Sequence, residues 1–276
     1  MQALPSALAL IAAFGLAPAA LRALAAGGFV RENYRGRPLP YPLGFLAVPC
    51  ALIALVACAP LEELADVDVL RAGTRTVLLY GLGVALLGLV DDVFSREPRG
   101  WRGHGRAVLG GAFSTGALKA AGSLGLALFV LAGRYDQAGR YLLAVSVLVL
   151  ATNLFNLIDL RPGRSTKALV LLGAGLTIGT RDAGPLAALG VLAFPAVALG
   201  IYDLRERAML GDSGSSLMGA VAGLWIVLSL DTVGQLVALA LIGLASVYGE
   251  FRSLGALIER TPILRQLDSF GRPTHA

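Results

Sequence analysis

Two adjacent carboxylates, Asp91 and Asp92, stand at the end of an apolar run over residues 76–90. A run of this length is typical of a membrane span, and carboxylates at its end are costly unless they bind a cation or stand in water. The simpler alternative is that the pair only marks the end of a span. We therefore treat Asp91 and Asp92 as candidate catalytic residues, to be weighed against the rest of the chain.

A second polar segment lies within another apolar run. Asn153, Asn156 and Asp159 are spaced by three, so on a helix they form one polar stripe among apolar neighbours. Interhelical hydrogen bonding is the simplest use of such a stripe. Two amides and a carboxylate on one face also suit a polar ligand, so the stripe is a second candidate for binding or catalysis.

The third segment, residues 211–215, places Asp212 in a turn of glycine and serine directly before an apolar run. Gly211 would let the backbone approach a ligand closely, and N–H groups such as that of Ser213, at the start of the following helix, favour a phosphate oxygen. A helix N-cap is the alternative role for Asp212. Because Mg²⁺ is held by one or two carboxylates plus substrate phosphates, carboxylates near basic residues suggest Mg²⁺ and a diphosphate.

Positive charge is available close to these segments in the sequence. The basic residues concerned are Arg96, Arg99, Arg102, Arg106, Lys119, Arg164 and Lys167. The run from Arg96 to Arg106 has two interpretations that the sequence does not separate. It either binds anionic lipid beside the membrane or guides a diphosphate toward the site.

The composition assigns the chain to the integral membrane proteins. Of its 276 residues, 56% are hydrophobic and only 15% are charged, and the mean hydropathy is +0.73. Soluble domains carry about a quarter charged residues. No polar block is long enough to bury a core of its own, so we expect one transmembrane domain over residues 1–276. Cys50 and Cys58 have no ligating neighbours and are interpreted as packing residues.

The fold class predicted from the apolar runs is an all-α, polytopic membrane protein with about nine transmembrane helices. The expected spans cover residues 4–27, 42–60, 76–92, 115–132, 141–158, 166–180, 184–202, 214–230 and 234–256. An odd number of spans places the two termini on opposite sides of the membrane.

The basic residues indicate which side is which. Of 23 Lys and Arg residues, only five fall in the loops on one side, and these are Arg71, Arg75, Arg134, Arg140 and Arg181. Since cytoplasmic loops carry the excess of Lys and Arg, the N-terminus is expected outside and the C-terminus in the cytoplasm. The net charge of +5 thus reports orientation, and no nucleic acid partner is expected.

This orientation gathers the candidate residues on one face of the membrane. The expected cytoplasmic segments are the loops 28–41, 93–114, 159–167 and 203–213 and the tail 257–276. All three acidic segments fall in or beside these loops. We therefore expect an active site that faces the cytoplasm.

Taken together, these motifs resemble those of a known enzyme family. In chain order they are Gly88-Leu-Val-Asp91-Asp92, Lys119 at the head of the next span, Asn153-xx-Asn156-xx-Asp159 and Leu210-Gly-Asp212-Ser-Gly-Ser215. They resemble the polyprenyl-phosphate N-acetylhexosamine-1-phosphate transferases, which include the phospho-N-acetylmuramoyl-pentapeptide transferase. The resemblance covers about residues 30 to 225.

The resemblance implies a Mg²⁺-dependent transfer at the cytoplasmic face of the cell membrane. A polyprenyl phosphate such as undecaprenyl phosphate would attack the β-phosphate of a UDP-aminosugar and release UMP, in cell-envelope glycan synthesis. A homodimer is one assembly to expect. Asp212 would bind the metal, with Asp92 close to it, and Asp91 and Asp92 would orient or deprotonate the lipid phosphate. The residues implied in substrate binding or catalysis are Lys119, Asn153, Asn156, Asp159, Arg164, Lys167, Gly211 and Ser213.

The sequence also departs from the family pattern. Members usually have Asp-Gly-x-x-Gly-Leu after the amide stripe, whereas residues 159–164 read Asp-Leu-Arg-Pro-Gly-Arg. The only histidines, His104 and His275, do not form the His-rich loop that many members carry. Two alternatives therefore stay open: a non-catalytic relative that binds polyprenyl phosphate or joins a cell-envelope assembly, and a transporter. The transporter is less favoured, since the acidic groups lie at span ends rather than at mid-membrane.

Overall fold

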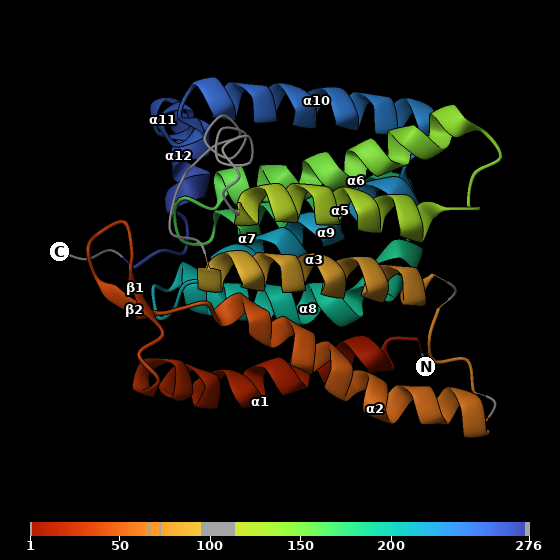
Figure 1. Cartoon of the computed structure of the whole chain (residues 1–276), viewed down its shortest axis with the longest axis horizontal. Coiled ribbons are helices and arrows are strands. Elements are labelled where there is room, and N and C mark those ends of the chain that lie inside the picture. The colour runs from red at the N-terminus through yellow and green to blue at the C-terminus, as the bar shows by residue number, and fades with distance from the viewer. Residues whose placement is uncertain (1, 66, 72, 95–113, 274–276) are drawn as a thin grey trace.

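The computed structural model of the protein is a bundle of long helices that run roughly along one direction (Figure 1). It describes residues 2–65, 67–71, 73–94 and 114–273. The elements are α1 (Leu4–Ala26), β1 (Val30–Glu32), β2 (Pro38–Pro40), η1 (Leu43–Leu46), α2 (Ala47–Ala65), α3 (Thr74–Phe94), α5 (Thr115–Leu131), α6 (Ala138–Ile158), α7 (Arg164–Thr180), α8 (Gly184–Leu204), α9 (Gly211–Ser229), α10 (Thr232–Phe251), α11 (Leu254–Arg260) and α12 (Pro262–Ser269).

Six stretches of helix are long and apolar enough to cross a membrane. They are Leu4–Ala26, Leu43–Ala65, Thr74–Phe94, Ala138–Ile158, Gly184–Leu204 and Thr232–Gly249. The shorter α5 is also apolar, and α7 and α9 occupy the remaining expected spans. The expectation of a helical, multi-pass membrane protein is confirmed, with one addition, the short antiparallel hairpin formed by β1 and β2.

Helix α9 lies at the centre of the bundle, in contact with α3, α6, α7 and α8. Almost every residue from Ser213 to Ile226 is buried. Small residues permit this close packing, as is usual between helices in membranes. A Cβ added at Gly219 would lie 2.7 Å from the Cα of Thr152 in α6. The N-terminal turn of α9 is therefore held by its neighbours on several sides.

Helix α10 packs mainly on α6, at the edge of the bundle (Figure 1). It exposes a row of large apolar side chains, as a lipid-facing helix does: Val233, Leu236, Val237, Leu241, Leu244 and Val247. The apolar run continues to residue 256, but α10 ends at Phe251. Ser253 then begins α11 by accepting a hydrogen bond from the backbone N–H of Ala256 at 3.2 Å. Two short helices, α11 and α12, follow.

The loops that carry the candidate residues lie at one end of the bundle. The hairpin β1–β2 and the helices α11 and α12 are seen at the left of Figure 1, where α6 ends and α7 begins. The loop between α5 and α6 lies at the opposite end. Segments far apart in the chain therefore meet at one end.

Candidate active site

Asp91, Lys119 and Asp212 form one charged cluster at this end. The Lys119 ammonium donates to Oδ2 of Asp91 at 2.8 Å and to Oδ2 of Asp212 at 2.5 Å. The three side chains come from α3, α5 and α9, so the bundle, and not one local motif, brings them together. Two carboxylates share a single ammonium, which leaves this point with the character of a cation site.

Asp92 turns the other way, toward the first turn of α9. Its Oδ1 accepts the backbone N–H of Asp212 at 2.7 Å and the hydroxyl of Tyr41, and its Oδ2 accepts the N–H of Ser213 at 2.9 Å. A carboxylate at a helix N-terminus accepts hydrogen bonds from free N–H groups, and its negative charge interacts favourably with the helix dipole. Asp92 thus caps α9 from a neighbouring helix and fixes the turn that presents Asp212.

The backbone around this turn is packed very closely. Gly211 adopts a left-handed φ of +76°, and a Cβ there would meet the Asp92 carboxylate at 2.8 Å. A Cβ at Gly88 would lie 2.4 Å from the carbonyl oxygen of Asp212. Both glycines are therefore needed for α3 to reach the turn.

The polar stripe on α6 divides into separate contacts. Asn156 Oδ1 accepts the hydroxyl of Ser215 at 2.6 Å and that of Ser216 at 3.0 Å, which ties α6 to α9. Asp159 accepts the hydroxyl of Ser165 at 2.7 Å. Asn153 is exposed, and its side chain makes no hydrogen bond within the described part of the chain. The structure therefore brings Asn156 and Asp159 toward the α9 turn but leaves Asn153 aside.

A cleft of about 170 Å³ opens beside Asp212. Its walls come from the hairpin β1–β2, the loop 159–162 and the turn 209–212. The Asp212 side chain is 41% exposed, compared with 11% for Asp91 and 15% for Lys119. Asp212 is thus the member of the charged cluster that a ligand in the cleft reaches most easily. Leu160 and Arg161, the residues that depart from the family pattern, also line the cleft.

Asp159 stands in this wall beside another carboxylate, Asp203. Asp203 accepts the backbone N–H of Gly163 at 2.7 Å and so braces the loop. Burial, and then the negative charge of Asp203, raise the pKa of Asp159 well above its ordinary value. The Asp159 carboxyl can therefore carry a proton more readily than an exposed aspartate.

Sequence reasoning missed Tyr41, Arg31 and Asp203. The Arg31 guanidinium lies 4.1 Å from the ring centroid of Tyr41 and donates to its hydroxyl at 2.7 Å. Burial and the nearby Asp92 raise the pKa of Tyr41, so this hydroxyl keeps its proton and donates a hydrogen bond to Asp92. All three residues lie in or beside loops expected at the cytoplasmic face. This position was the sequence feature that could have indicated a role in the site.

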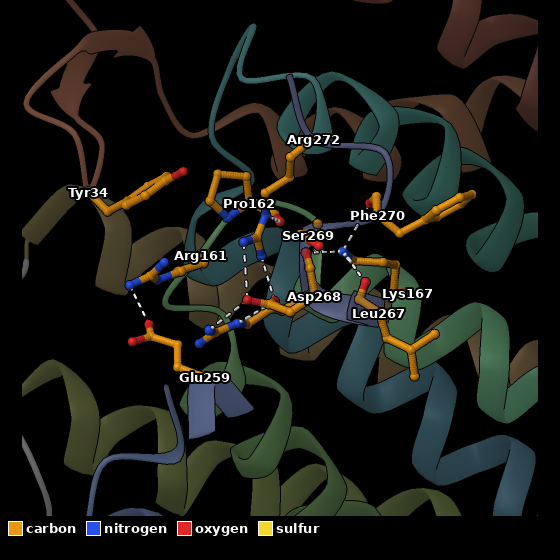
Figure 2. Close-up of polar contacts among 12 residues, drawn as sticks. Tyr34, Arg161, Pro162, Lys167, Glu259, Leu267, Asp268, Ser269, Phe270 and Arg272 are labelled. Carbon is orange, nitrogen blue, oxygen red and sulfur yellow. Dashed lines mark hydrogen bonds and ion pairs between the residues drawn. The ribbon is translucent and has the colours of Figure 1, made fainter. Parts of the chain in front are cut away.

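Arg164 and Lys167, expected to bind substrate, face the C-terminal segment instead, as Figure 2 shows for Lys167. Arg164 pairs with Asp268, and Lys167 donates to backbone carbonyl oxygens of residues 267, 268 and 270. The basic run from Arg96 to Arg106 lies outside the described residues. Lys119 is thus the expected basic ligand that the structure places beside Asp212.

The comparisons with known proteins agree with the location of this cluster. A family model described as glycosyl transferase family 4 matches residues 74–230, more than half of the chain. The matched region runs from α3 to the end of α9 and contains Asp91, Lys119 and Asp212. A search of curated proteins found no match.

Proposed function

The chain belongs to glycosyl transferase family 4, and from this premise we propose that it transfers a sugar-1-phosphate from a UDP-aminosugar to a polyprenyl phosphate, with release of UMP. Membership makes it a membrane glycosyl transferase in general. One observation carries the finer proposal: Asp91 and Asp212 converge on Lys119 at the edge of the cleft. Phosphoryl transfer depends chiefly on such positioning and charge neutralisation.

The residues present fit Mg²⁺. In the described part of the chain no three metal-ligating side chains cluster together. Mg²⁺ needs only one or two carboxylates when substrate phosphates complete its shell, and Asp91 and Asp212 supply two. Asp92 suits the metal less, because three donors already occupy its oxygens. A bound Mg²⁺ would neutralise phosphate charge during the reaction.

In the proposed reaction, an oxygen of the lipid phosphate attacks the β-phosphorus of the donor. The bond between that phosphorus and the oxygen bridging to the α-phosphate breaks, and UMP leaves with this oxygen. Lys119 lies where phosphate charge would gather, and Asp91, which accepts from Lys119, would keep the ammonium in place. Asp159 and Asn156 would stand on the nucleotide side, while Asp92 holds the α9 turn in position.

We further propose the topology implied by the loop charges. All nine expected spans, including α5, α7 and α9, would cross the cell membrane, with the N-terminus outside and the cleft facing the cytoplasm. Polyprenyl phosphate would then enter from the bilayer and the UDP-aminosugar from the cytoplasm. The product, a lipid diphosphosugar, would serve cell-envelope glycan synthesis.

A second candidate function is a relative that binds polyprenyl phosphate without turnover. The observation that favours it is the engagement of Arg164 and Lys167 by the C-terminal segment, which removes two cations from the proposed phosphate site. Leu160 in the cleft wall adds apolar surface where a nucleotide would lie.

The two functions separate in one assay. Purified protein is incubated with Mg²⁺, undecaprenyl phosphate and a panel of UDP-N-acetylhexosamines, and UMP is measured. Release that requires both lipid and Mg²⁺ with one donor is the expected result. No release with any donor, together with saturable binding of the lipid phosphate, would replace the proposed transferase by the non-catalytic relative.

A further inference from the structure

The C-terminal segment 252–272 is fastened to the loop that forms one wall of the cleft. Figure 2 shows the contact, at which Asp268 of α12 is the central residue. Its carboxylate accepts from Arg164 at 2.8 and 3.0 Å and from Arg272 at 2.6 and 3.1 Å. Only 8% of Asp268 is exposed. Paired hydrogen bonds between arginine and a carboxylate are among the strongest polar contacts in proteins.

Further contacts extend this attachment on both sides of Asp268. Lys167 donates to the carbonyl oxygens of Leu267 at 2.9 Å and Phe270 at 3.3 Å, which lie at the C-terminal end of α12. A cation at this end donates hydrogen bonds to free carbonyl groups and interacts favourably with the helix dipole. Arg272 also donates to the carbonyl oxygen of Pro162 at 2.8 Å. The attachment therefore holds loop backbone as well as side chains.

One contact leads directly into the cleft. Arg161 lines the cleft, pairs with Glu259 of α11, and has its guanidinium carbon 5.1 Å from the ring centroid of Tyr34. Tyr34 lines the opposite wall, in the hairpin loop. The C-terminal segment thus contacts Arg161, which lines the cleft and also contacts Tyr34 of the hairpin loop.

The attachment places one carboxylate between two guanidinium groups. Burial alone would raise the pKa of Asp268, but hydrogen bonds from Arg164 and Arg272 outweigh burial and lower this pKa to about 2. The carboxylate is therefore charged at any physiological pH, and it offsets part of the positive charge of two buried guanidinium groups. Removing it would leave those groups without a counter-charge, which is costly in a buried place.

We propose that residues 252–272 form a strap that shapes the cleft wall 159–163 for the nucleotide part of the donor, with Asp268 as its positioning residue. The inference rests on the proposed function, since it assigns that wall to the donor and not to the lipid. The strap lies outside the region that matches the family model, residues 74–230.

The test uses the full-length protein with Asp268→Asn, which keeps the shape and removes the charge, and Asp268→Glu, which keeps the charge. Hydrogen exchange by mass spectrometry is followed in residues 159–167 and 252–272, and steady-state kinetics are measured against donor and lipid separately. Asp136→Asn, an exposed carboxylate at the opposite end of the bundle, is the matched control.

We expect Asp268→Asn to raise exchange in both segments and to raise the donor KM about tenfold, which is the effect of losing one charge-assisted contact. The lipid KM and kcat should stay within about twofold of wild type on the same argument, and Asp268→Glu should recover most of the donor KM. The milder Glu259→Gln removes a half-exposed pair and should raise the donor KM by about twofold, so it reports the effect even where Asp268→Asn folds poorly.

Two results would overturn the strap. Faster exchange with an unchanged donor KM would reduce it to a structural contact, and unchanged exchange would show that Asp268 does not fasten it. If wild-type protein releases no UMP, the proposed function is rejected independently of the strap. The strap is then tested by the affinity of the protein for UDP. A weaker affinity for UDP in Asp268→Asn than in Asp136→Asn supports it, and equal affinities, or no UDP binding at all, contradict it.

Discussion

Two charged regions lie beside the same cleft and differ in how far their charged side chains are exposed to a ligand. In the cluster of Asp91, Lys119 and Asp212, two carboxylates share one ammonium, and the Asp212 side chain stays 41% exposed. Where the strap meets α7, Arg164 and Arg272 surround Asp268, and all three side chains are at most 8% exposed. The first region keeps an exposed carboxylate at the cleft, whereas the two arginines of the second are buried and donate to Asp268.

The difference suggests that the charges of the first region serve to bind a ligand and that those of the second region stabilise the structure. A metal cation that carries substrate phosphates can bind at the first region, because the accessible carboxylate of Asp212 can still coordinate a metal. Arg164 and Lys167 offer a phosphate little, since they already donate to the carboxylate of Asp268 and to backbone carbonyl oxygens of the strap. Basic residues near an active site are therefore no guide to phosphate binding until their partners are known.

The strongest way to break this comparison is Asp212→Asn. We expect transfer activity to fall on the order of 10²- to 10³-fold, as for loss of one group that neutralises charge in a transition state. The protein should stay folded, because Asp92 holds the backbone N–H of Asp212 and not its side chain. UMP release and the thermal unfolding temperature are measured together, with Asp136→Asn as the control. Activity above half of wild type would contradict the role of the cluster.

The next variant, Asp92→Asn, tests whether the adjacent carboxylates have different tasks. An amide would present N–H groups to donors that now meet oxygen, so we expect a loss of about 1–3 kcal/mol in stability. Thermal unfolding in the same lipid nanodiscs compares this variant with Asp212→Asn. An equal unfolding temperature for the two would mean that Asp92 does not cap α9.

Gly88→Ala sharpens the comparison at the backbone that carries the cluster. The added Cβ would lie 2.4 Å from the carbonyl oxygen of Asp212, so α3 or the turn must shift, at a cost of about 1–3 kcal/mol. Gly125→Ala in α5 is the matched control, since a Cβ there meets nothing within 4 Å. The unfolding temperature should fall in the first variant only, and activity should fall with it. A silent Gly88→Ala would show that the turn tolerates displacement.

The smallest effect concerns the strap and acid. The folded pKa of Asp268 is about 2, below the ordinary aspartate value of 3.8. A lowered pKa contributes stability that is complete above the unfolded pKa, near 4, and is lost as the pH falls through 2. Protection of residues 252–272 against hydrogen exchange, taken relative to the intrinsic exchange rate at each pH, should therefore fall between about pH 4 and pH 2 in wild type. Asp268→Asn should lack this step, and the same step in both proteins would refute the assignment.

The helices could be predicted from the sequence, because the length of each apolar run decides where a helix can lie. The run 115–132 became Thr115–Leu131, and 184–202 became Gly184–Leu204. The start of α9 at Gly211, before the expected residue 214, depends on a cap from Asp92 that lies 120 residues away in the chain. Contacts of this kind leave no local signal.

The residue types that gather at the candidate site could be predicted from the sequence, but the partners of each residue could not. Asp91, Lys119 and Asp212 were expected and do meet. The direction of Asp92 could not be foreseen, because neighbouring residues on a helix point to different sides. Arg164 was expected to bind substrate, yet its partner is Asp268, 104 residues later. Net charge and spacing indicate where polar groups gather, and packing decides which of them remain available.

The central claim is that the metal and its phosphates bind at Asp212 and its neighbours, and not beside Arg164 and Lys167. Binding of Mn²⁺, as a paramagnetic substitute for Mg²⁺, is measured by electron paramagnetic resonance in the presence of UDP. Wild type, Asp212→Asn and Asp268→Asn are compared at matched protein concentration. The account predicts saturable Mn²⁺ binding in wild type, its loss in Asp212→Asn, and its retention in Asp268→Asn once UDP is raised to saturation. Equal Mn²⁺ binding by wild type and Asp212→Asn would contradict it.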